Sequence, residues 1–425
     1  MLSRTNNQSH QKNYLSKTLL LQSSNNRHGI TLEPQRAKTS FSDIKEIIHV
    51  GVPGSIQSPW ESAAGGIGRN EDDAKLAAIG EGIERYSASI YKLPLKKRDE
   101  IPKDSRIDAE QWCLFTKEQR ENPKFPFGNI YSDRCLYSNV FDFQDNQEYW
   151  IPNPMVALRD DYQTGVPTSS GLATGPSSYT ALLRAIQELI ERDALMISWL
   201  HSVPGRSIKI PKNYMNEVNK LKGEAWAFEL TPDYSPFPVI AVAGGIMKQG
   251  KWRYSLGVAC RETWQAALDK AYLEWNQGVL FAGIYEKHVD TKLIANPYKL
   301  KSFDEHAIFY TLHPDLWYQL PLFKNRDILV DIKVKGKATN LETSLNLIKK
   351  ALMKNNIRMY YRDLTTIDAE QLGVKVIRAS SPDLASIFAH QEWPLIGNLQ
   401  NKLKSRYSWA PKNLEFPNLM PHPLG

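Results

Sequence analysis

The residues best suited to chemistry in this chain are two pairs of glutamates, each followed at once by an arginine. The two sets are Glu81, Glu84 and Arg85, and Glu188, Glu191 and Arg192. Residues three apart share one face of a helix, so each pair would present two carboxylates side by side. A fainter third copy of the spacing, Ala271-x-x-Glu274-x-x-Gln277, has an amide in place of the second carboxylate.

One such motif is weak evidence, because charges at this spacing commonly cover the solvated face of a helix. The segments around the two pairs, residues 64–89 and 168–201, are nevertheless alike, since each runs from a glycine-rich turn into a helical pattern of apolar residues. Aligned on the glutamates, the matching residues are Ala74, Leu76, Ala78, Ile79 and Ile83 with Ala181, Leu183, Ala185, Ile186 and Ile190. A decorative face needs no such repetition, so we interpret the two segments as an internal repeat.

Four glutamates that converge on one site would repel one another, and would repel a phosphate group, unless divalent cations lay between them. Mg²⁺ takes one or two carboxylates and completes its shell with water and phosphate oxygens, so two pairs of glutamates suit two ions that hold a triphosphate. The glycine turns before the two helices would present backbone N–H groups to phosphate. The sequence therefore predicts a magnesium and nucleotide site.

The elements that must position these residues are predicted to be helices joined to short strands. Helices are expected within 64–89, from residue 180, from residue 263 and over 341–355, and strands over 149–152, 155–158, 228–247, 252–259, 327–334 and 374–379. This alternation indicates a mixed α/β fold. Because no low-complexity linker divides the chain, we predict an N-terminal arm over 1–45 and one catalytic domain over 46–425, with a proline-rich tail over 417–425.

Composition excludes a few classes of function. The 425 residues carry a formal net charge of +7 without a concentrated Lys/Arg stripe among aromatic residues, so nucleic-acid binding is disfavoured. The apolar run at 239–247 is interrupted by two glycines and is far too short to span a membrane. The three cysteines are far apart and lack metal-binding spacing, which favours buried thiols in a reducing compartment. We therefore expect a soluble, cytoplasmic protein, and we expect His201 to be a core or surface histidine rather than a catalytic one.

The two repeat segments resemble the YcaO family. They read GGIGRNEDDAKLAAIGEGIERYS and TSSGLATGPSSYTALLRAIQELIERDA, and the ending RDLTTIDAEQLGVKVIRASSPDL…NLMPHPLG resembles the streptolysin-type (SagD-like) cyclodehydratase branch. The resemblance covers residues 45–425. It implies a YcaO-like fold that binds ATP with Mg²⁺ without a Walker motif, and the chain indeed contains no G-x-x-x-x-G-K-[ST].

The resemblance also implies roles for particular residues. The implied metal ligands are Glu81, Glu84, Glu188 and Glu191. The candidate ATP contacts are Gly66, Gly68, Ser169, Ser170, Gly171, Arg192, Glu274 and Gln277. The two serines are interpreted equally well as turn formers. The candidate catalytic tail consists of Pro421, Pro423 and the terminal Gly425.

Two departures from the family pattern stand out. Ile67 occupies the middle of a Gly-x-Gly turn where the family often has lysine, so a lysine contact to phosphate is missing or comes from elsewhere. The chain ends Pro421-His422-Pro423-Leu424-Gly425, with glycine where a Pro-x-Pro-x-Pro ending would place its last proline. Because glycine restricts the backbone less than proline does, we expect this chain end to be less rigid than a Pro-x-Pro-x-Pro ending.

The reaction implied by the resemblance is ATP-dependent cyclodehydration. A Cys, Ser or Thr side chain of a ribosomally made precursor peptide attacks the preceding carbonyl, the resulting oxygen is phosphorylated, and loss of phosphate leaves a thiazoline or oxazoline in a bacteriocin-like product. Because residues 1–45 are too short for a leader-binding domain, a separate partner similar to ocin-ThiF or ubiquitin-activating enzymes is expected. An FMN-dependent azoline dehydrogenase and a homodimer of the catalytic subunit are further expectations.

Two alternatives remain open at the level of sequence. Other YcaO enzymes make thioamides or macroamidines, and a non-catalytic member would keep only the fold. The proline-rich ending favours azoline formation. The intact set of four glutamates disfavours a scaffold.

Overall fold

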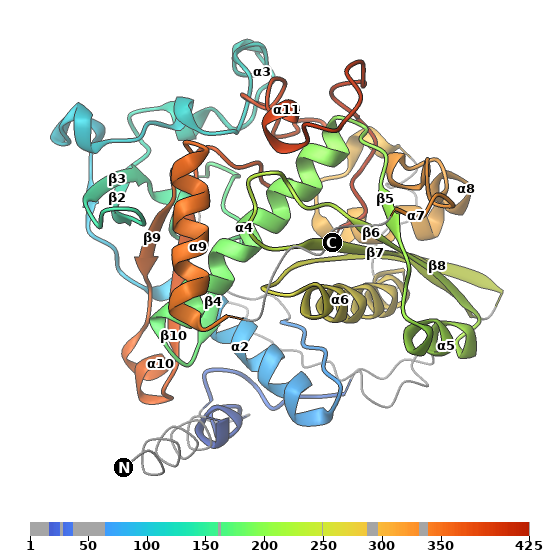
Figure 1. The fold of residues 1–425 in the computed structure, drawn as a ribbon. Helices are drawn as coiled ribbons and strands as arrows, with labels where there is room; N and C mark the ends of the chain where they lie inside the picture. The colour runs from blue at the N-terminus through green and yellow to red at the C-terminus, as the bar shows by residue number, and fades with distance from the viewer. Residues whose placement is uncertain are drawn as a thin grey trace.

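A long helix, α4 (Ser178–Leu200), runs through the middle of the molecule and contacts a sheet on either side (Figure 1). The computed structural model describes residues 17–25, 29–36, 64–159, 163–248, 250–286, 296–330 and 339–424. Most of the expected N-terminal arm lies outside the described residues, as does Gly425. The fold is the mixed α/β class predicted from the sequence.

The first sheet has six strands, which are paired antiparallel in the order β1-β2-β9-β10-β4, with β3 also paired to β2. Its strands are β1 (Leu95–Lys96), β2 (Tyr137–Asp142), β3 (Glu148–Pro152), β4 (Leu172–Gly175), β9 (Tyr360–Asp363) and β10 (Lys375–Ser380). In β10, Ile377 lies opposite Ala173 of β4. This pairing places the turn before α4 beside the C-terminal third of the chain.

The second sheet is an antiparallel meander in the order β5-β6-β7-β8. Its strands are β5 (Arg206–Ile208), β6 (Gly223–Glu229), β7 (Val239–Lys248) and β8 (Lys251–Cys260). Side chains of a strand alternate between the two faces of a sheet. Tyr254, Leu256 and Val258 of β8 accordingly join the main core, whereas Ala259 packs into a separate cluster with α6 (Trp264–Tyr285).

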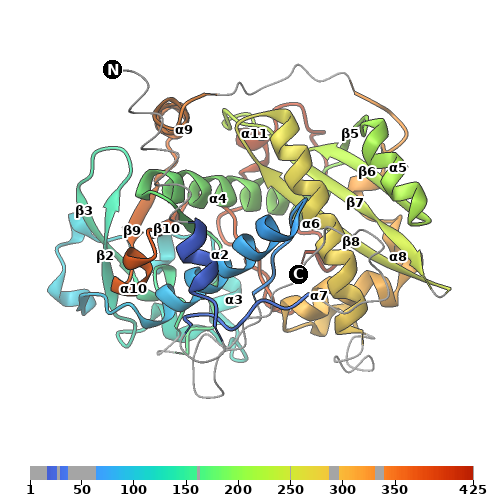
Figure 2. The ribbon, with the colours of Figure 1, turned by 90° about the horizontal axis from the view of Figure 1, so that it is seen from below.

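The remaining helices cover the edges and faces of the two sheets. They are α2 (Glu71–Ile90), α3 (Lys117–Glu121), α5 (Lys212–Lys220), α7 (Phe303–Leu312), α8 (Pro314–Trp317), α9 (Leu341–Lys354), α10 (Ile367–Gln371) and α11 (Leu403–Arg406). Seen from below, α2, α4 and α6 come together at the centre of the molecule (Figure 2). The three helices that carry the repeated glutamate spacing are therefore neighbours in space.

Side-chain caps explain where these three helices begin. Asn70 accepts a hydrogen bond from the N–H of Asp73 at 2.9 Å, and Ser177 and Thr263 cap α4 and α6 in the same way. Such caps satisfy one of the backbone N–H groups that a helix start leaves unpaired. Acidic residues in the first turn of α2 add a favourable interaction with the helix dipole.

Some predicted elements are confirmed and others are wrong. Strands are confirmed over 149–152, 252–259 and 374–379, as is the helix over 341–355. The single strand expected over 228–247 is instead two strands, β6 and β7, because prolines 232, 236 and 238 lack the N–H that a sheet ladder needs.

Two further strand predictions also fail. The strand expected over 155–158 is replaced by a 3₁₀ turn, Asn153–Met155, that begins around a proline. Within the expected strand 327–334, Leu329 forms only an isolated bridge with Ser207, and residues 331–334 lie outside the described residues. No helix among the described residues is long and apolar enough to span a membrane.

Candidate functional site

The structure brings the predicted glutamates into one electrostatic cluster. Burial raises the pKa of Glu84 to about 8, and the negative charges of Glu188 and Glu81 add to the shift. Burial also raises the pKa of Glu191 to about 8, with the charge of Glu274 as the next cause. Carboxylates from α2, α4 and α6, most of them only partly exposed to water, thus repel one another, and a bound cation would relieve that repulsion.

Each of the four predicted metal ligands accepts a hydrogen bond from a backbone N–H. Glu81 and Glu188 bind the N–H groups of Gly65 and Gly171, at 2.8 and 3.0 Å, in the turns that precede their helices. The second glutamate of each pair binds the end of a strand: Glu84 accepts from Thr174 at 2.6 Å and Glu191 from Cys260 at 3.1 Å. One oxygen of every carboxylate is therefore fixed in position by the backbone.

The arginines that follow the glutamates lie in the same cluster. Arg85 donates to Glu81 at 2.5 Å, and Arg192 donates to Glu188 at 3.4 Å through Nη2. The Nε and Nη1 atoms of Arg192 are buried and make no hydrogen bond within the described part of the chain, and Nε lies 4.0 Å from Glu191. Buried donors without acceptors are costly, so these atoms suit an anionic ligand such as phosphate.

The geometry also bears on how Mg²⁺ would be held. Among the residues that the structure describes, no three Asp, Glu, His or Cys side chains are grouped closely enough to hold one metal ion. Mg²⁺ commonly binds through one or two carboxylates and keeps water and phosphate oxygens as its other ligands. Each glutamate pair supplies the one or two carboxylates that Mg²⁺ needs, and in each carboxylate one oxygen is held by a backbone N–H. The donor set therefore fits Mg²⁺ together with a nucleotide.

The turns that precede the helices can approach closely because of their glycines. Gly171 has φ of +83°, and a Cβ there would lie 2.4 Å from the carbonyl oxygen of Ala379. A Cβ on Gly65 would lie 2.7 Å from the amide nitrogen of Gln277, which places the predicted Gln277 of α6 beside the first turn. Gly66 and Gly68 follow in that turn, and their role as nucleotide contacts stays a prediction.

The residue that departs from the family lysine is buried. Ile67 is in contact with Leu280 of α6 in a small apolar cluster and cannot serve as a phosphate contact. Another cation of the glutamate cluster is Lys270, whose Nζ lies 3.1 Å from the carboxylate of Glu274. Burial raises the pKa of Glu81, and the charges of Arg85 and Lys270 oppose that shift. Lys270 is thus placed to supply the missing positive charge, although its position in α6 gave no signal in the glycine turn.

The two serines of the second turn differ in their surroundings. Ser170 is buried, and its hydroxyl makes no hydrogen bond within the described residues. Ser169 contributes its carbonyl oxygen to a turn, where it accepts from the N–H of Leu172 at 2.9 Å. The hydroxyl of Ser170 is thus available to a ligand, and the role of both serines as nucleotide contacts stays a prediction.

Arg378 is a charged residue of the site that the sequence analysis missed. It lies in β10 and is buried, and it donates to the carbonyl oxygens of Thr168 at 2.7 Å and Met155 at 3.2 Å. Burial lowers its pKa to about 10, and the charge of Glu188 acts in the opposite direction. The available signal was a single arginine inside the apolar strand 374–379.

The C-terminal tail is docked inside the molecule, and the last described residues lie near its centre (Figure 1). Residues 421–424 are all buried. Burial lowers the pKa of His422, and among the further causes is the positive charge of Arg192. The tail therefore reaches the neighbourhood of the glutamate cluster, as its candidate catalytic role requires, while the position of Gly425 lies outside the described residues.

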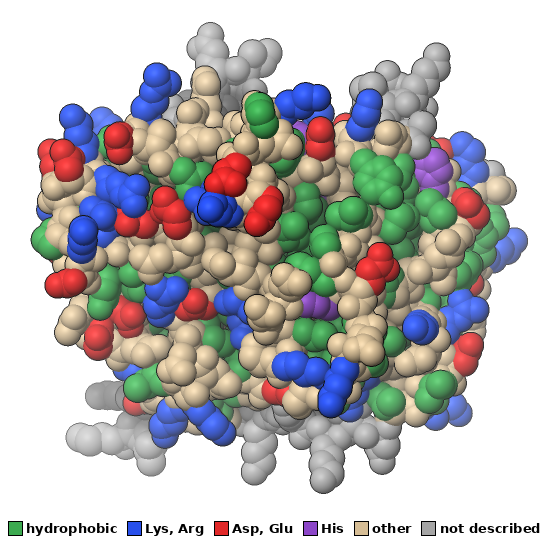
Figure 3. Space-filling view, turned by 90° about the horizontal axis from the view of Figure 1, so that it is seen from above, with side chains coloured by type: hydrophobic (Ala, Val, Ile, Leu, Met, Phe, Trp, Pro, Cys, Tyr) green, Lys and Arg blue, Asp and Glu red, His purple; other side chains and the backbone are tan. Residues whose placement is uncertain are grey.

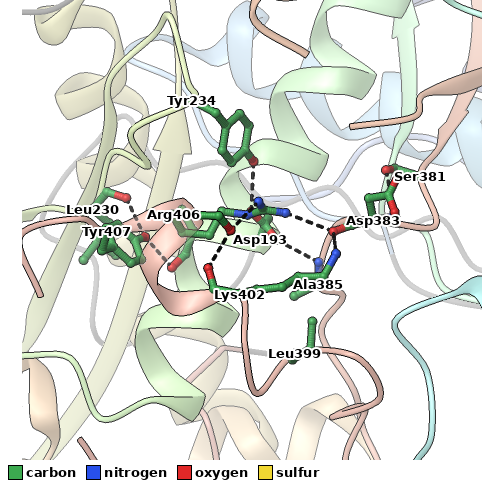
Figure 4. A network of polar contacts seen from close by, with 12 residues as sticks. Asp193, Leu230, Tyr234, Ser381, Asp383, Ala385, Leu399, Lys402, Arg406 and Tyr407 are labelled. Carbon is green, nitrogen blue, oxygen red and sulfur yellow. Dashed lines mark hydrogen bonds and ion pairs between the residues drawn. The ribbon is translucent and has the colours of Figure 1, made fainter. Parts of the chain in front are cut away.

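The residue after Arg192 anchors the site to the rest of the fold (Figure 4). Asp193 is fully buried and accepts hydrogen bonds from the N–H of Ala385 at 2.8 Å, the hydroxyl of Tyr234 at 2.9 Å and Nε of Arg406 at 2.8 Å. Arg406 also donates to the carbonyl oxygen of Asp383 at 3.0 Å. This buried ion pair joins α4 to the loop 381–385 and to α11, so it holds Glu191 and Arg192 in place.

Other side chains have structural roles. His201 is buried, lies 3.1 Å from the carbonyl oxygen of Leu399 and packs against Phe416, as expected for a core histidine. The three cysteines are free and buried, as expected. On the face shown in Figure 3, Lys and Arg side chains are interspersed with Asp and Glu rather than gathered in one field.

Comparison with known proteins finds one matching family model and several solved structures. The family model described as YcaO cyclodehydratase, ATP- and Mg²⁺-binding, matches residues 65–385. No curated protein matches the chain by sequence. Solved structures share the fold at low identity, and among three of them the share of each chain that the match covers differs.

A heterocyclase in complex with substrate and cofactor has a TM-score of 0.73 and 17% identity, and the match covers 96% of this chain and 57% of that chain. YcaO from Methanopyrus kandleri bound with AMPPCP and Mg²⁺ has a TM-score of 0.55 and 15% identity, over 76% of this chain and 78% of that one. The E. coli microcin synthetase McbBCD complex with pro-MccB17 bound has a TM-score of 0.54 and 17% identity, over 78% and 86%. The present chain thus spans little more than half of the first structure.

A matched family model over three quarters of the sequence, with ATP and Mg²⁺ in its description, accounts for a carboxylate cluster beside buried, unpartnered donors. The chain belongs to the YcaO cyclodehydratase family and binds ATP and Mg²⁺.

Proposed function

We propose that this protein is an ATP-dependent peptide cyclodehydratase of the SagD-like branch that converts Cys, Ser or Thr residues of a ribosomally made precursor into thiazolines or oxazolines. The observation that carries the proposal is the repeated glutamate pair. All four carboxylates are held by backbone N–H groups, and the second pair, Glu188 and Glu191, lies beside Arg192 with its unpartnered donors. A scaffold that had lost activity would not need to keep repelling carboxylates in this arrangement.

Different residues of the site would hold the metal ions and the phosphates of the nucleotide. The four glutamates would hold Mg²⁺, and Arg192, Arg378 and the hydroxyl of Ser170 would face the phosphates. Lys270 would take the part of the lysine that Ile67 replaces. When bound, ATP with Mg²⁺ supplies the phosphoryl group that turns the former amide oxygen into a leaving group. Catalysis of this kind depends mostly on positioning and on neutralising charge.

The tail would serve the peptide rather than the nucleotide. Its last described residues are buried, and His422 lies within the electrostatic reach of Arg192, which supports a place for the tail beside the reacting groups. A terminal carboxylate there could orient the attacking side chain of the peptide or accept its proton. We assign this role to Pro421, Pro423 and Gly425 together.

Partners are part of the same proposal. A microcin synthetase of similar fold has been solved as a multi-subunit complex with its pro-peptide bound. For the present chain we propose a leader-binding partner similar to ocin-ThiF proteins, an FMN-dependent azoline dehydrogenase and a homodimer of the catalytic subunit. The free, buried cysteines favour the cytoplasm as its compartment.

The experiment is to incubate the purified protein with ATP, Mg²⁺, its partner and a candidate precursor, and to analyse the peptide by mass spectrometry. Azoline formation predicts the loss of one water for each ring, together with release of ADP and phosphate, and replacement of the modified Cys, Ser or Thr by alanine should abolish the loss. A mass change from exchange of oxygen for sulfur would indicate a thioamide. Water loss that persists after those replacements would indicate a macroamidine, and either result would reject the proposal.

A further inference from the structure

Four consecutive carbonyl groups near the chain end each lie at hydrogen-bond distance from a different side chain. The carbonyl oxygens of Leu419, Met420, Pro421 and His422 face, in that order, Nε2 of Gln391 at 2.8 Å, Nε1 of Trp199 at 3.0 Å, the hydroxyl of Tyr310 at 2.7 Å and Nδ1 of His306 at 3.1 Å. All four of these side chains are buried. We call this set of donors the carbonyl clamp.

The donors of the carbonyl clamp come from three separate parts of the fold. Trp199 lies at the end of α4, and Gln391 lies in the segment that follows β10. His306 and Tyr310 are four apart on α7 and so lie on one face of that helix. Four successive carbonyl groups can reach donors on three separate segments only if the tail follows one path.

The clamp holds the tail mainly by its backbone, and in addition the ring of His306 stacks on that of His422, with the ring centroids 4.2 Å apart. Pro417, Pro421 and Pro423 have no N–H, so this stretch cannot join a sheet through a regular ladder. Its buried carbonyls still need donors, and the side chains of the clamp supply them. Just before the clamp, the N–H of Asn418 donates to the carbonyl oxygen of Leu200 at 2.8 Å, which ties the tail to the end of α4.

The same helix carries the nucleotide site and part of the clamp. Trp199 follows Arg192 by seven residues, so the two side chains share a face of α4 and are separated by about two helical turns, or roughly 10 Å. Glu188 and Glu191 lie on the helix just before Arg192. Any displacement of the tail relative to α4 would therefore change its reach toward the glutamate cluster.

We propose that Gln391, Trp199, Tyr310 and His306 are positioning residues that fix residues 419–422 of the tail relative to the nucleotide site. The catalytic part of this inference rests on the proposed function, whereas the clamp itself can be tested without it. Because the grip is on carbonyl groups, the path of the tail does not depend on a proline at its last position.

His306 is the adjustable member of the clamp. Its Nδ1 lies 3.1 Å from the carbonyl oxygen of His422, and its Nε2 lies 3.0 Å from that of Ala389. Burial lowers the pKa of His306 to about 4, so the ring is neutral near pH 7 and carries one N–H. It can donate to only one of the two carbonyls at a time. Tyr310 and Gln391 are therefore the better residues for a test.

The first arm of the test is a double-mutant cycle read by thermal unfolding of the full protein. Tyr310→Phe removes only the hydroxyl that donates to Pro421, and Gln391→Met removes only the amide that donates to Leu419. Each change should lower Tm by roughly 1–3 °C, because it leaves a buried carbonyl without a donor. In a protein that lacks residues 421–425, Tyr310→Phe should have no further effect on Tm, whereas Gln391→Met should retain its effect because Leu419 is still present.

The second arm measures azoline formation in the presence of the partner. Both substitutions should lower kcat by at least about fivefold and leave KM for ATP within about twofold, since the clamp acts on the tail and not on the nucleotide. Tyr137→Phe is the matched control, because Tyr137 is a buried residue of β2, far along the chain from the tail, and the substitution removes the hydroxyl that donates to Asp108. It should lower Tm to a similar extent without the fall in kcat.

The outcomes separate the two hypotheses. If the parent protein forms no azoline but the unfolding cycle shows the expected coupling, the proposed function fails and the clamp stands. If Tyr310→Phe lowers Tm equally with and without the tail, the hydroxyl has another structural role and the clamp is overturned. The positioning role is also overturned if the clamp variants keep the parental kcat or behave like Tyr137→Phe.

Discussion

Glu84 of α2 accepts a hydrogen bond of 2.6 Å from the backbone N–H of Thr174, four positions before α4 begins. The same relationship recurs in the next repeat, where Glu191 of α4 accepts a hydrogen bond from the backbone N–H of Cys260, four positions before α6 begins. Each glutamate-bearing helix is thus tied to the strand that leads into the next such helix. The internal repeat of the sequence has this physical form, and it gathers the carboxylates at one place.

The first prediction concerns the charges of the two α4 glutamates. Glu188→Gln or Glu191→Gln keeps the shape of the side chain but removes a negative charge from the cation site, so affinity for Mg-ATP or its turnover should fall at least about tenfold. Calorimetric titration with Mg-AMPPCP measures the binding. Glu121→Gln, at an exposed position of α3, is the control. Parental binding and turnover in both site variants would remove the basis for the metal assignment.

A second prediction follows from the raised pKa of Glu84. Because the folded-state value of about 8 exceeds the ordinary value of 4.5, protonation of Glu84 stabilises the fold, and this contribution is lost as the pH rises from about 4.5 through about 8. The Tm of the metal-free protein should fall over that range, and Glu84→Gln should make the fall shallower. Addition of Mg²⁺ and ADP should raise Tm more at pH 8.5 than at pH 5.5, since cations favour the ionised carboxylates. An unchanged slope in the variant would contradict the assignment.

A third prediction tests the unpartnered donors of Arg192. Arg192→Lys keeps the positive charge but replaces the guanidinium with a single ammonium, so it cannot present Nε and Nη1 to phosphate. KM for ATP should rise by about tenfold, with a smaller change for Arg85→Lys, the equivalent residue in the first repeat, which donates to Glu81. Initial rates at varied ATP concentration measure both variants. Equal effects would mean that the two arginines have the same role.

The sequence predicted the parts of the site that lie on one helix at a time. The spacing of the glutamates is a local feature, and α4 and α6 begin within two residues of the expected positions 180 and 263. The error at β6 and β7 had a local cause as well, because three prolines between them were given too little weight.

Contacts between distant segments could not be predicted in this way. The hydrogen bond from Cys260 to Glu191 joins residues 69 positions apart. Arg378 has its role only because β10 pairs with β4 and thereby places it beside the second turn. A short proline-rich terminus is more often exposed than docked, so the burial of residues 421–424 depends on donors elsewhere in the fold.

A fourth prediction concerns dependence on the leader-binding partner. The isolated chain should process its precursor slowly, and the partner should accelerate the reaction by raising the effective concentration of peptide at the site. Rates with and without the partner at low peptide concentration measure this, and the difference should shrink as the peptide concentration is raised. Equal rates at every concentration would show that the chain recognises its precursor alone.

The last prediction is that removal of residues 421–425 separates nucleotide binding from ring formation. The glutamates and Arg192 lie on α2 and α4, outside the deleted segment, so the affinity for Mg-AMPPCP should stay within about threefold of the parent. The deletion removes the carbonyl groups bound by Tyr310 and His306, together with His422, which lies within the electrostatic reach of Arg192. Azoline formation, measured as water loss by mass spectrometry, should therefore fall by at least about a hundredfold, as expected when a group that contacts the reacting atoms is lost. Undiminished ring formation by the truncated protein would show that the docked tail has only a structural role.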